Sequence, residues 1–157
     1  MTFAVATPTD RDIVITREFA APRARVFAAH TEPELLKRWF GPHGWRLTVC
    51  EIDLRVGGAW RYVLHGPDDQ EMVLRGAYLE IDPPARIVTT ENNGDCDARA
   101  DHESIVTLEL TEHAGRTTLT NTVRFPTREI RDAVLASGMD RGVAQGYDRL
   151  ADTIGSA

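Results

Sequence analysis

The sequence predicts an α+β fold in which a curved antiparallel sheet of seven strands packs against one long C-terminal helix. Seven segments between residues 12 and 126 alternate apolar and polar side chains, and this period of two is typical of strands. Beyond Pro126 the period lengthens to that of a helix and continues to Ile154. With 157 residues, 42% of them hydrophobic, the chain suffices for one domain with its own core.

The N-terminal region begins with residues 1–11, which show no periodicity and are expected to be a flexible lead-in. A single domain is expected over residues 12–157. Its first strand covers residues 12–20, where β-branched residues alternate with polar ones. The strand ends at Pro22, because proline removes a donor from the hydrogen-bonding ladder of a sheet.

Two short helices are predicted after this strand. In residues 23–30 the apolar side chains gather on one side, as in an amphipathic helix. The second helix runs through Trp39, with Thr31 expected as its N-cap and Pro33 in its first turn. Gly41-Pro42 ends it, because glycine and proline both disfavour continuation of a helix.

Six further strands are predicted, with short turns between most of them. Glycine, proline and aspartate mark these turns, as at Gly57-Gly58 and Asp82-Pro83-Pro84. Such short connections favour the antiparallel pairing of consecutive strands in a meander. The predicted strands cover residues 46–54, 58–66, 71–82, 85–91, 103–112 and 116–126.

One long helix is predicted over residues 127–154, with Thr127 as its N-cap. Gly138, Gly142 and Gly146 recur within it at every fourth position. These glycines either allow the helix to pack closely on the sheet or leave room for a ligand. The apolar stripe of the helix must be covered by the sheet and includes Ile130, Val134, Met139, Val143, Tyr147, Leu150 and Ile154.

A cavity is expected between the sheet and this helix. A strongly twisted sheet curves, and a helix laid across its concave side leaves space unless large side chains fill it. The aromatic residues could form the walls of such a cavity or belong to an ordinary core. Together with Met139 and Val143 of the helix, the candidates for contact with a ligand are Trp39, Trp45, Trp60, Tyr62, Tyr78 and Tyr147.

Ionisable residues are further candidates for the ligand site. His43 lies in a loop near the expected cavity mouth, although an exposed loop histidine is the alternative. Arg75 enters the cavity if its side of the strand faces inward, and Glu91 or Glu109 could then be its partner. A cross-strand pair on the surface is the alternative interpretation. An enclosed acid could serve as a general base.

The usual signatures of catalysis, cofactor binding and metal binding are missing from the sequence. It contains no nucleophile elbow, phosphate loop or dinucleotide fingerprint, and its five histidines show no metal-binding spacing. We therefore expect neither a metal nor a cofactor. A net charge of −6 argues against nucleic acid as a partner. The sequence shows no membrane-spanning run and no signal peptide, so we expect a cytoplasmic protein, which could form a homodimer.

Five motifs occur in one order along residues 12–154: APRARVF, PELLKRWFGP, VGGAWR, RGAYLEIDPP and SGMDRG. In this order they resemble the bacterial family named after the activator of the 90-kDa heat-shock protein ATPase, within the START-like SRPBCC superfamily. The resemblance implies a helix-grip fold, in which the sheet grips the C-terminal helix. It also implies an internal pocket, which holds lipids, polyketides or other apolar molecules in various relatives.

This fold hosts carriers, cyclases, hydrolases and co-chaperone modules, so it does not fix the function. Our main hypothesis is a small-molecule binding protein that holds an apolar or aromatic ligand between the sheet and the C-terminal helix. The alternatives are a cofactor-independent hydrolase, cyclase or dehydratase that uses the same cavity, and a chaperone-associated interaction module. A chaperone partner is not expected, because the sequence lacks the additional N-terminal domain of the eukaryotic co-chaperone.

Overall fold

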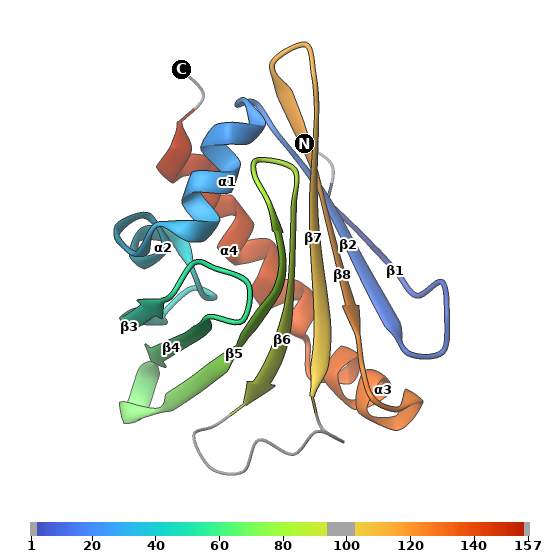
Figure 1. Cartoon of the computed structure of the whole chain (residues 1–157). Coiled ribbons are helices and arrows are strands. Elements are labelled where there is room, and N and C mark those ends of the chain that lie inside the picture. Colours follow the sequence, from blue (N-terminus) through green and yellow to red (C-terminus); the bar gives the residue numbers. More distant parts are fainter. Residues whose placement is uncertain (1–2, 94–102, 156–157) are drawn as a thin grey trace.

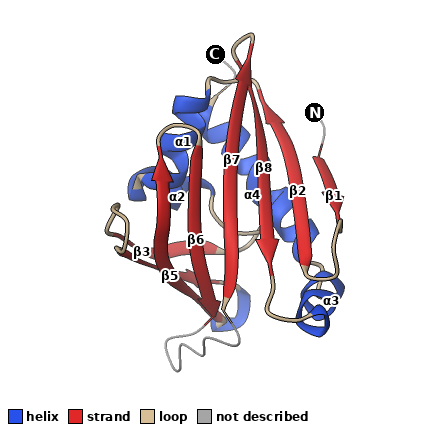
Figure 2. Cartoon of the chain, turned by 45° about the vertical axis from the view of Figure 1, so that its right-hand side comes forward, coloured by secondary structure: helices blue, strands red, loops and turns tan. Residues whose placement is uncertain are grey.

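The computed structural model describes residues 3–93 and 103–155 and shows the predicted α+β architecture, in which an antiparallel sheet carries helices on one face (Figure 2). The strands of the described part are β1 Phe3–Ala6, β2 Asp12–Phe19, β3 Arg46–Ile52, β4 Ala59–His65, β5 Glu71–Asp82, β6 Arg86–Asn93, β7 Ser104–His113 and β8 Arg116–Arg124. Its helices are α1 Arg23–Thr31, α2 Pro33–Trp39, α3 Arg128–Ala136 and α4 Met139–Ile154, with a 3-10 turn, η1, at Pro67–Asp69.

The eight described strands form one antiparallel sheet in the order β1-β2-β8-β7-β6-β5-β4-β3. Strands β3 to β8 are neighbours in chain order, which confirms the predicted meander. Strand β2 joins the sheet by pairing with β8, the last strand of the meander, from Asp12 opposite Arg124 to Phe19 opposite Thr117. As a result, β2 is the second strand from one edge of the sheet, and α4 lies behind the middle strands of the sheet in Figure 1.

The number of strands differs from the prediction by one. All seven predicted strands are present, and β5 begins and ends where expected, at Glu71 and Asp82. The additional strand is β1, which pairs with β2 from Phe3 opposite Arg17 to Ala6 opposite Val14. Residues 3–6 are therefore an edge strand and not a flexible lead-in. Four residues are too few to show a clear alternation in the sequence.

Two register shifts bend the half of the sheet that holds β3 to β6. One lies between Leu47 and Val49, where β3 pairs with β4. The other lies between Tyr78 and Glu80, where β5 pairs with β6. An extra residue on one strand increases the local twist and bends the strand. The shifts therefore contribute to the concave face over which the helices lie.

The two short helices form as predicted, except for the cap between them. Thr31 was expected to cap α2, but it is the last residue of α1, and its hydroxyl donates to the carbonyl oxygen of Phe27 at 3.1 Å. Glu32 precedes α2 instead and provides no side-chain cap. Pro33 is the first residue of α2, a position where proline has no helical hydrogen bond to lose.

The predicted long helix is divided into α3 and α4 at Gly138. This glycine has φ of 84°, a left-handed conformation that glycine adopts readily and other residues rarely do. The prediction of one uninterrupted helix is therefore wrong, although the apolar period continues on both sides of the break. At the start of α3, Thr127 is the N-cap as expected, and its hydroxyl accepts from the Ile130 amide at 3.1 Å.

The core lies between the sheet and α4, and an ion pair attaches the helix to β2. Arg17 is almost fully buried, and its Nη1 lies 2.9 Å from Oδ1 of the exposed Asp148. Apolar side chains from β2, β7, β8 and α4 fill the space beside this pair. The most deeply buried of them are Ile13, Ile15, Phe19, Leu110, Leu119 and Leu150.

Candidate functional site

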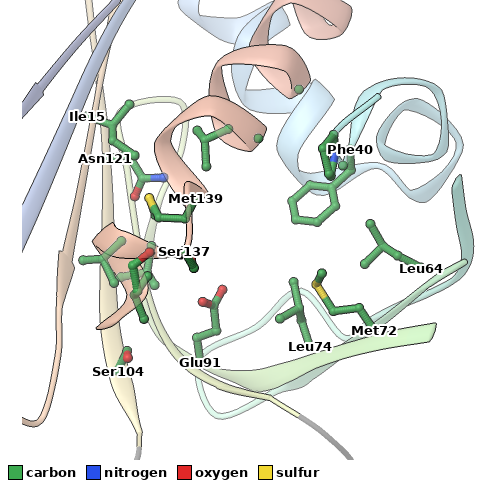
Figure 3. A pocket seen from close by; sticks show the side chains of 18 of the residues that line it. Ile15, Phe40, Leu64, Met72, Leu74, Glu91, Ser104, Asn121, Ser137 and Met139 are labelled. Atoms are coloured by element: carbon green, nitrogen blue, oxygen red, sulfur yellow. Dashed lines mark hydrogen bonds between the residues drawn. The ribbon is translucent and has the colours of Figure 1, made fainter. Parts of the chain in front are cut away.

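A pocket of about 820 Å³ lies between the concave face of the sheet and helices α3 and α4 (Figure 3). Side chains of β2, β4, β5, β6, β7 and β8 contribute to its wall. Most of the lining is apolar, which favours an apolar molecule over water as the occupant. The apolar wall includes Ile15, Leu64, Leu74, Val106, Val123 and Val143.

One wall of the pocket is the turn between α2 and β3, which α4 holds in place. Arg149 donates from Nη1 to the carbonyl oxygens of Gly41 at 3.1 Å and Trp45 at 3.3 Å. Gln145 Oε1 accepts from the backbone amide of His43 at 3.0 Å. Both side chains belong to α4, so this helix positions the turn as well as the pocket lining.

The three glycines of the C-terminal segment have different roles. Gly138 separates the two helices, whereas Gly142 and Gly146 line the pocket. A Cβ on Gly142 would lie 3.5 Å from Pro42 Cβ, and one on Gly146 would lie 3.5 Å from the Gly41 carbonyl oxygen. These are ordinary contacts, so the two positions lie against the turn without a strict need for glycine.

Trp39 and Tyr147 form the aromatic part of the lining, together with Phe40, which was not a predicted site residue. Trp39 is buried, and its indole N–H donates to the Ala29 carbonyl at 2.9 Å. Phe40 packs edge-on against Tyr62, with 5.1 Å between ring centroids. The signal for Phe40 was its position directly after a helix that ends beside the expected cavity.

Trp60, Tyr62 and Tyr78 are buried but lie outside the lining. Tyr62 lies behind Phe40 and contacts Trp60 at 4.7 Å between ring centroids. Burial raises the pKa of Tyr62 well above its usual range and that of Tyr78 to about 12. These rings therefore belong to the core that supports the pocket wall.

His43 and Trp45 also lie outside the lining, although they follow the lining residues Gly41 and Pro42 closely in the sequence. The His43 side chain is exposed, as the alternative interpretation proposed. Trp45 packs against the backbone of Gly66, where an added Cβ would lie only 2.5 Å from the indole ring. Its ring therefore covers the turn after β4.

The face of β5 that turns inward carries Met72 and Leu74, which line the pocket (Figure 3). Alternation along the strand then places Arg75 on the opposite face, where it is paired in register with Arg61 of β4. The inward placement of Arg75 is therefore wrong. Its suggested partner Glu109 forms a surface ion pair with Arg86, at 2.8 Å.

Glu91 of β6 is the predicted ionisable residue that faces the pocket. Its carboxyl group points into the open space between Met139 and Leu74 (Figure 3). In the described part of the chain, no hydrogen bond or ion pair holds this carboxyl group. Burial raises its pKa from 4.5 to about 7 because little solvent stabilises the charge.

Asn121 of β8 is a polar lining residue that sequence reasoning missed. Its Nδ2 donates to the Tyr147 hydroxyl oxygen at 3.2 Å, and burial raises the pKa of Tyr147 to about 12. The signal was available in the sequence, because Asn121 shares its face of the strand with the apolar Leu119 and Val123, whereas Thr120 and Thr122 lie on the polar face. A polar residue within an apolar inward row marks a candidate for the site.

His30 also lines the pocket and is neutral. Its Nδ1 lies 2.8 Å from the carbonyl oxygen of Val26, so this nitrogen carries the proton and donates. Burial lowers the pKa of His30 to about 4. The ring packs edge-on against Trp39, with 5.0 Å between centroids.

Within residues 3–93 and 103–155, no group of three or more histidine, cysteine, aspartate or glutamate side chains could hold a metal ion. In the same part of the chain, none of the helices has the length and apolar character needed to cross a membrane.

Comparison with known proteins relates most of the chain to one family. The model of the Activator of Hsp90 ATPase homolog 1-like protein family matches residues 20–155. A search of curated proteins gave no match.

Among solved structures, a protein from Rhodobacter sphaeroides is 32% identical, with a TM-score of 0.87 over 96% of this chain and 97% of that chain. A protein from Nitrosomonas europaea is 26% identical, with a TM-score of 0.84 over 94% and 96%. The AHSA1 protein from Silicibacter pomeroyi is 26% identical, with a TM-score of 0.72 over 90% and 95%.

Proposed function

The chain belongs to the Activator of Hsp90 ATPase homolog 1-like protein family, and from this premise we propose that it binds a small apolar or aromatic molecule between the sheet and α4. The START-like fold of this family is generally a ligand-binding fold. Binding would come mainly from burial of the apolar surface of the ligand, at roughly 25 cal/mol per Å².

The observation that carries this proposal is the pocket itself. Its volume of about 820 Å³ lies within the range of about 300 to 1,000 Å³ that is common for small-molecule sites. Its wall combines apolar side chains from the sheet and α4 with the aromatic rings of Trp39, Phe40 and Tyr147. A few polar groups, among them Glu91 and Asn121, would orient the ligand.

Two measurements test the proposal. Native mass spectrometry of the purified protein should detect a retained small molecule. Titration with the neutral fluorescent probe N-phenyl-1-naphthylamine should show saturable binding, and Val143→Phe should weaken it about tenfold because the added ring occupies the pocket. Val56→Phe is the matched control, because Val56 is exposed in the turn before β4 and lies outside the lining.

Absence of saturable probe binding to the wild-type protein would contradict the proposal. Equal probe affinity of the folded Val143→Phe and wild-type proteins would show that the probe binds elsewhere. Circular dichroism spectra that match the wild-type spectrum would confirm that both variants are folded.

A second candidate function is a cofactor-independent enzyme that uses the same pocket, and the Glu91 carboxyl group favours it. A carboxyl group with a pKa near 7 can exchange a proton with a bound substrate at neutral pH. For a hydrolase, Glu91→Gln should lower the turnover of apolar p-nitrophenyl esters by roughly 100-fold. Equal rates for both proteins would remove Glu91 from such a mechanism.

A further inference from the structure

The described residues of the pocket lining carry charge of one sign only. Among the described residues that form the lining, Glu91 is the one carboxyl group, and none is lysine or arginine. His30 is neutral because burial lowers its pKa to about 4. Glu103, at the Asn92 side of the lining, adds a second negative charge nearby. The described part of the lining therefore offers a negative group and no positive group to a ligand.

Several hydrogen-bond donors of the lining are engaged within the protein. Asn92 donates its amide to Glu103 at 3.0 Å, and Asn121 donates its amide to Tyr147 at 3.2 Å. Ser137 donates its hydroxyl to the Val134 carbonyl. The ring N–H groups of His30 and Trp39 bond to backbone carbonyls in the same way. None of these donors is directed to the Glu91 carboxyl group.

An ionised carboxylate in an apolar pocket is costly unless a cation or a set of donors compensates its charge. The raised pKa of Glu91 has the same cause, since burial disfavours the charged form. In the described part of the chain, no hydrogen bond or ion pair supplies this compensation. A ligand that carries a cation could supply it.

Building on the proposed binding function, we infer that the pocket selects an apolar molecule with a basic nitrogen, whose ammonium group pairs with the carboxylate of Glu91. The apolar part of this amine lies along the wall formed by Leu74, Val106 and Val143. A fatty acid of equal length is disfavoured, because its carboxylate would lie near that of Glu91 and the described lining contributes no cation between them. A neutral alcohol has intermediate affinity.

Displacement of N-phenyl-1-naphthylamine by octylamine, 1-octanol and octanoate tests this order of affinity. At about pH 8.5 octylamine is protonated, whereas the carboxyl groups of Glu91 and of octanoate are ionised. For the wild-type protein, octylamine should bind at least about tenfold more tightly than 1-octanol, and octanoate at least about tenfold more weakly. In Glu91→Gln the three affinities should agree within about threefold. Glu109→Gln, on the surface beside Arg86, is the matched control and should keep the order.

Each outcome decides between the two proposals. Equal wild-type affinities for octylamine and 1-octanol would overturn the inference and leave a general apolar pocket. Unchanged preference for the amine in Glu91→Gln would assign its recognition to another group and would also overturn the inference. If the probe itself does not bind, the proposed function fails. Retained binding of 1-octanol by Glu91→Gln would demonstrate that the pocket of this variant is intact.

Discussion

The side-chain amide of Asn121 donates a hydrogen bond to the hydroxyl oxygen of Tyr147, with 3.2 Å between Nδ2 and Oη. Asn121 belongs to β8 and Tyr147 to α4, so this bond joins the sheet and the helix that enclose the pocket. Tyr147 is also held by Phe19 of β2, whose ring meets it edge-on at 6.0 Å. The helix therefore has both polar and aromatic contacts to the sheet at this position.

Tyr147→Phe should lower the free energy of unfolding by about 1–3 kcal/mol, because it removes the acceptor for the Asn121 amide and leaves a polar group without its partner. Urea unfolding measures this change. A double-mutant cycle with Asn121→Ala should give a coupling energy of about 1 kcal/mol. Additive effects of the two substitutions would contradict an energetic role for this bond.

The strands were predictable because each has an alternating sequence and turn residues at its ends. β5 shows this best, since its bounds at Glu71 and Asp82 agree with the prediction. β1 was missed because its four residues are too few to show an alternating pattern. The strand is recognisable only from its pairing with β2 in the structure. The break at Gly138 was missed because a glycine in a helical pattern also fits an uninterrupted helix, and only its φ of 84° distinguishes the two.

The site could be predicted only as a region. Glu91, Trp39, Met139, Val143 and Tyr147 were named from sequence and line the pocket, whereas their roles as ligand contacts stay predictions. Arg75 was misplaced because β5 carries apolar residues on both faces, and periodicity does not identify the inward face of such a strand. Residue type alone also did not distinguish the aromatic residues that line the pocket from Trp60 and Tyr62, which are buried behind the lining.

Gly138 and Gly142 should respond in opposite ways to alanine. Gly138→Ala should destabilise the protein by about 1 kcal/mol, because the left-handed backbone at φ of 84° is unfavourable for a residue with a Cβ. Gly142→Ala should stabilise it by up to about 1 kcal/mol, because alanine favours the helix and the nearest atom is 3.5 Å away. Thermal and urea unfolding measure both. Destabilisation by Gly142→Ala would mean that the pocket wall requires glycine.

Arg149→Met should loosen the turn between α2 and β3. The guanidinium group donates to the carbonyl oxygens of Gly41, Trp45 and Arg38, at 3.1, 3.3 and 3.3 Å. Hydrogen bonds from a charged group contribute roughly 1.5–3 kcal/mol, so we expect destabilisation of this order. Amide hydrogen exchange in residues 41–45 should become faster.

Arg141→Met is the control for this prediction, because Arg141 is an exposed residue of the same helix. It should leave both the free energy of unfolding and the exchange of residues 41–45 within error of the wild type. If Arg149→Met changes neither quantity, the turn is held by the Gln145 bond and by packing instead.

Glu91 should make stability fall as the pH rises. Its pKa is about 7 in the folded protein and 4.5 in its ordinary state, so the folded protein holds this proton more tightly than the unfolded chain does. This contribution is fully present below about pH 4.5 and is lost as the pH rises through about 7. Glutamine cannot ionise, so Glu91→Gln should gain stability relative to the wild-type protein across this window.

Urea unfolding of the wild-type and Glu91→Gln proteins at about pH 5 and about pH 8 measures the predicted difference. The variant should be more stable than the wild type by a larger margin at the higher pH. Glu109→Gln should show no such gain, because Glu109 is exposed and paired with Arg86. A margin for Glu91→Gln that is equal at both pH values would mean that Glu91 is as well solvated in the folded protein as in the unfolded chain.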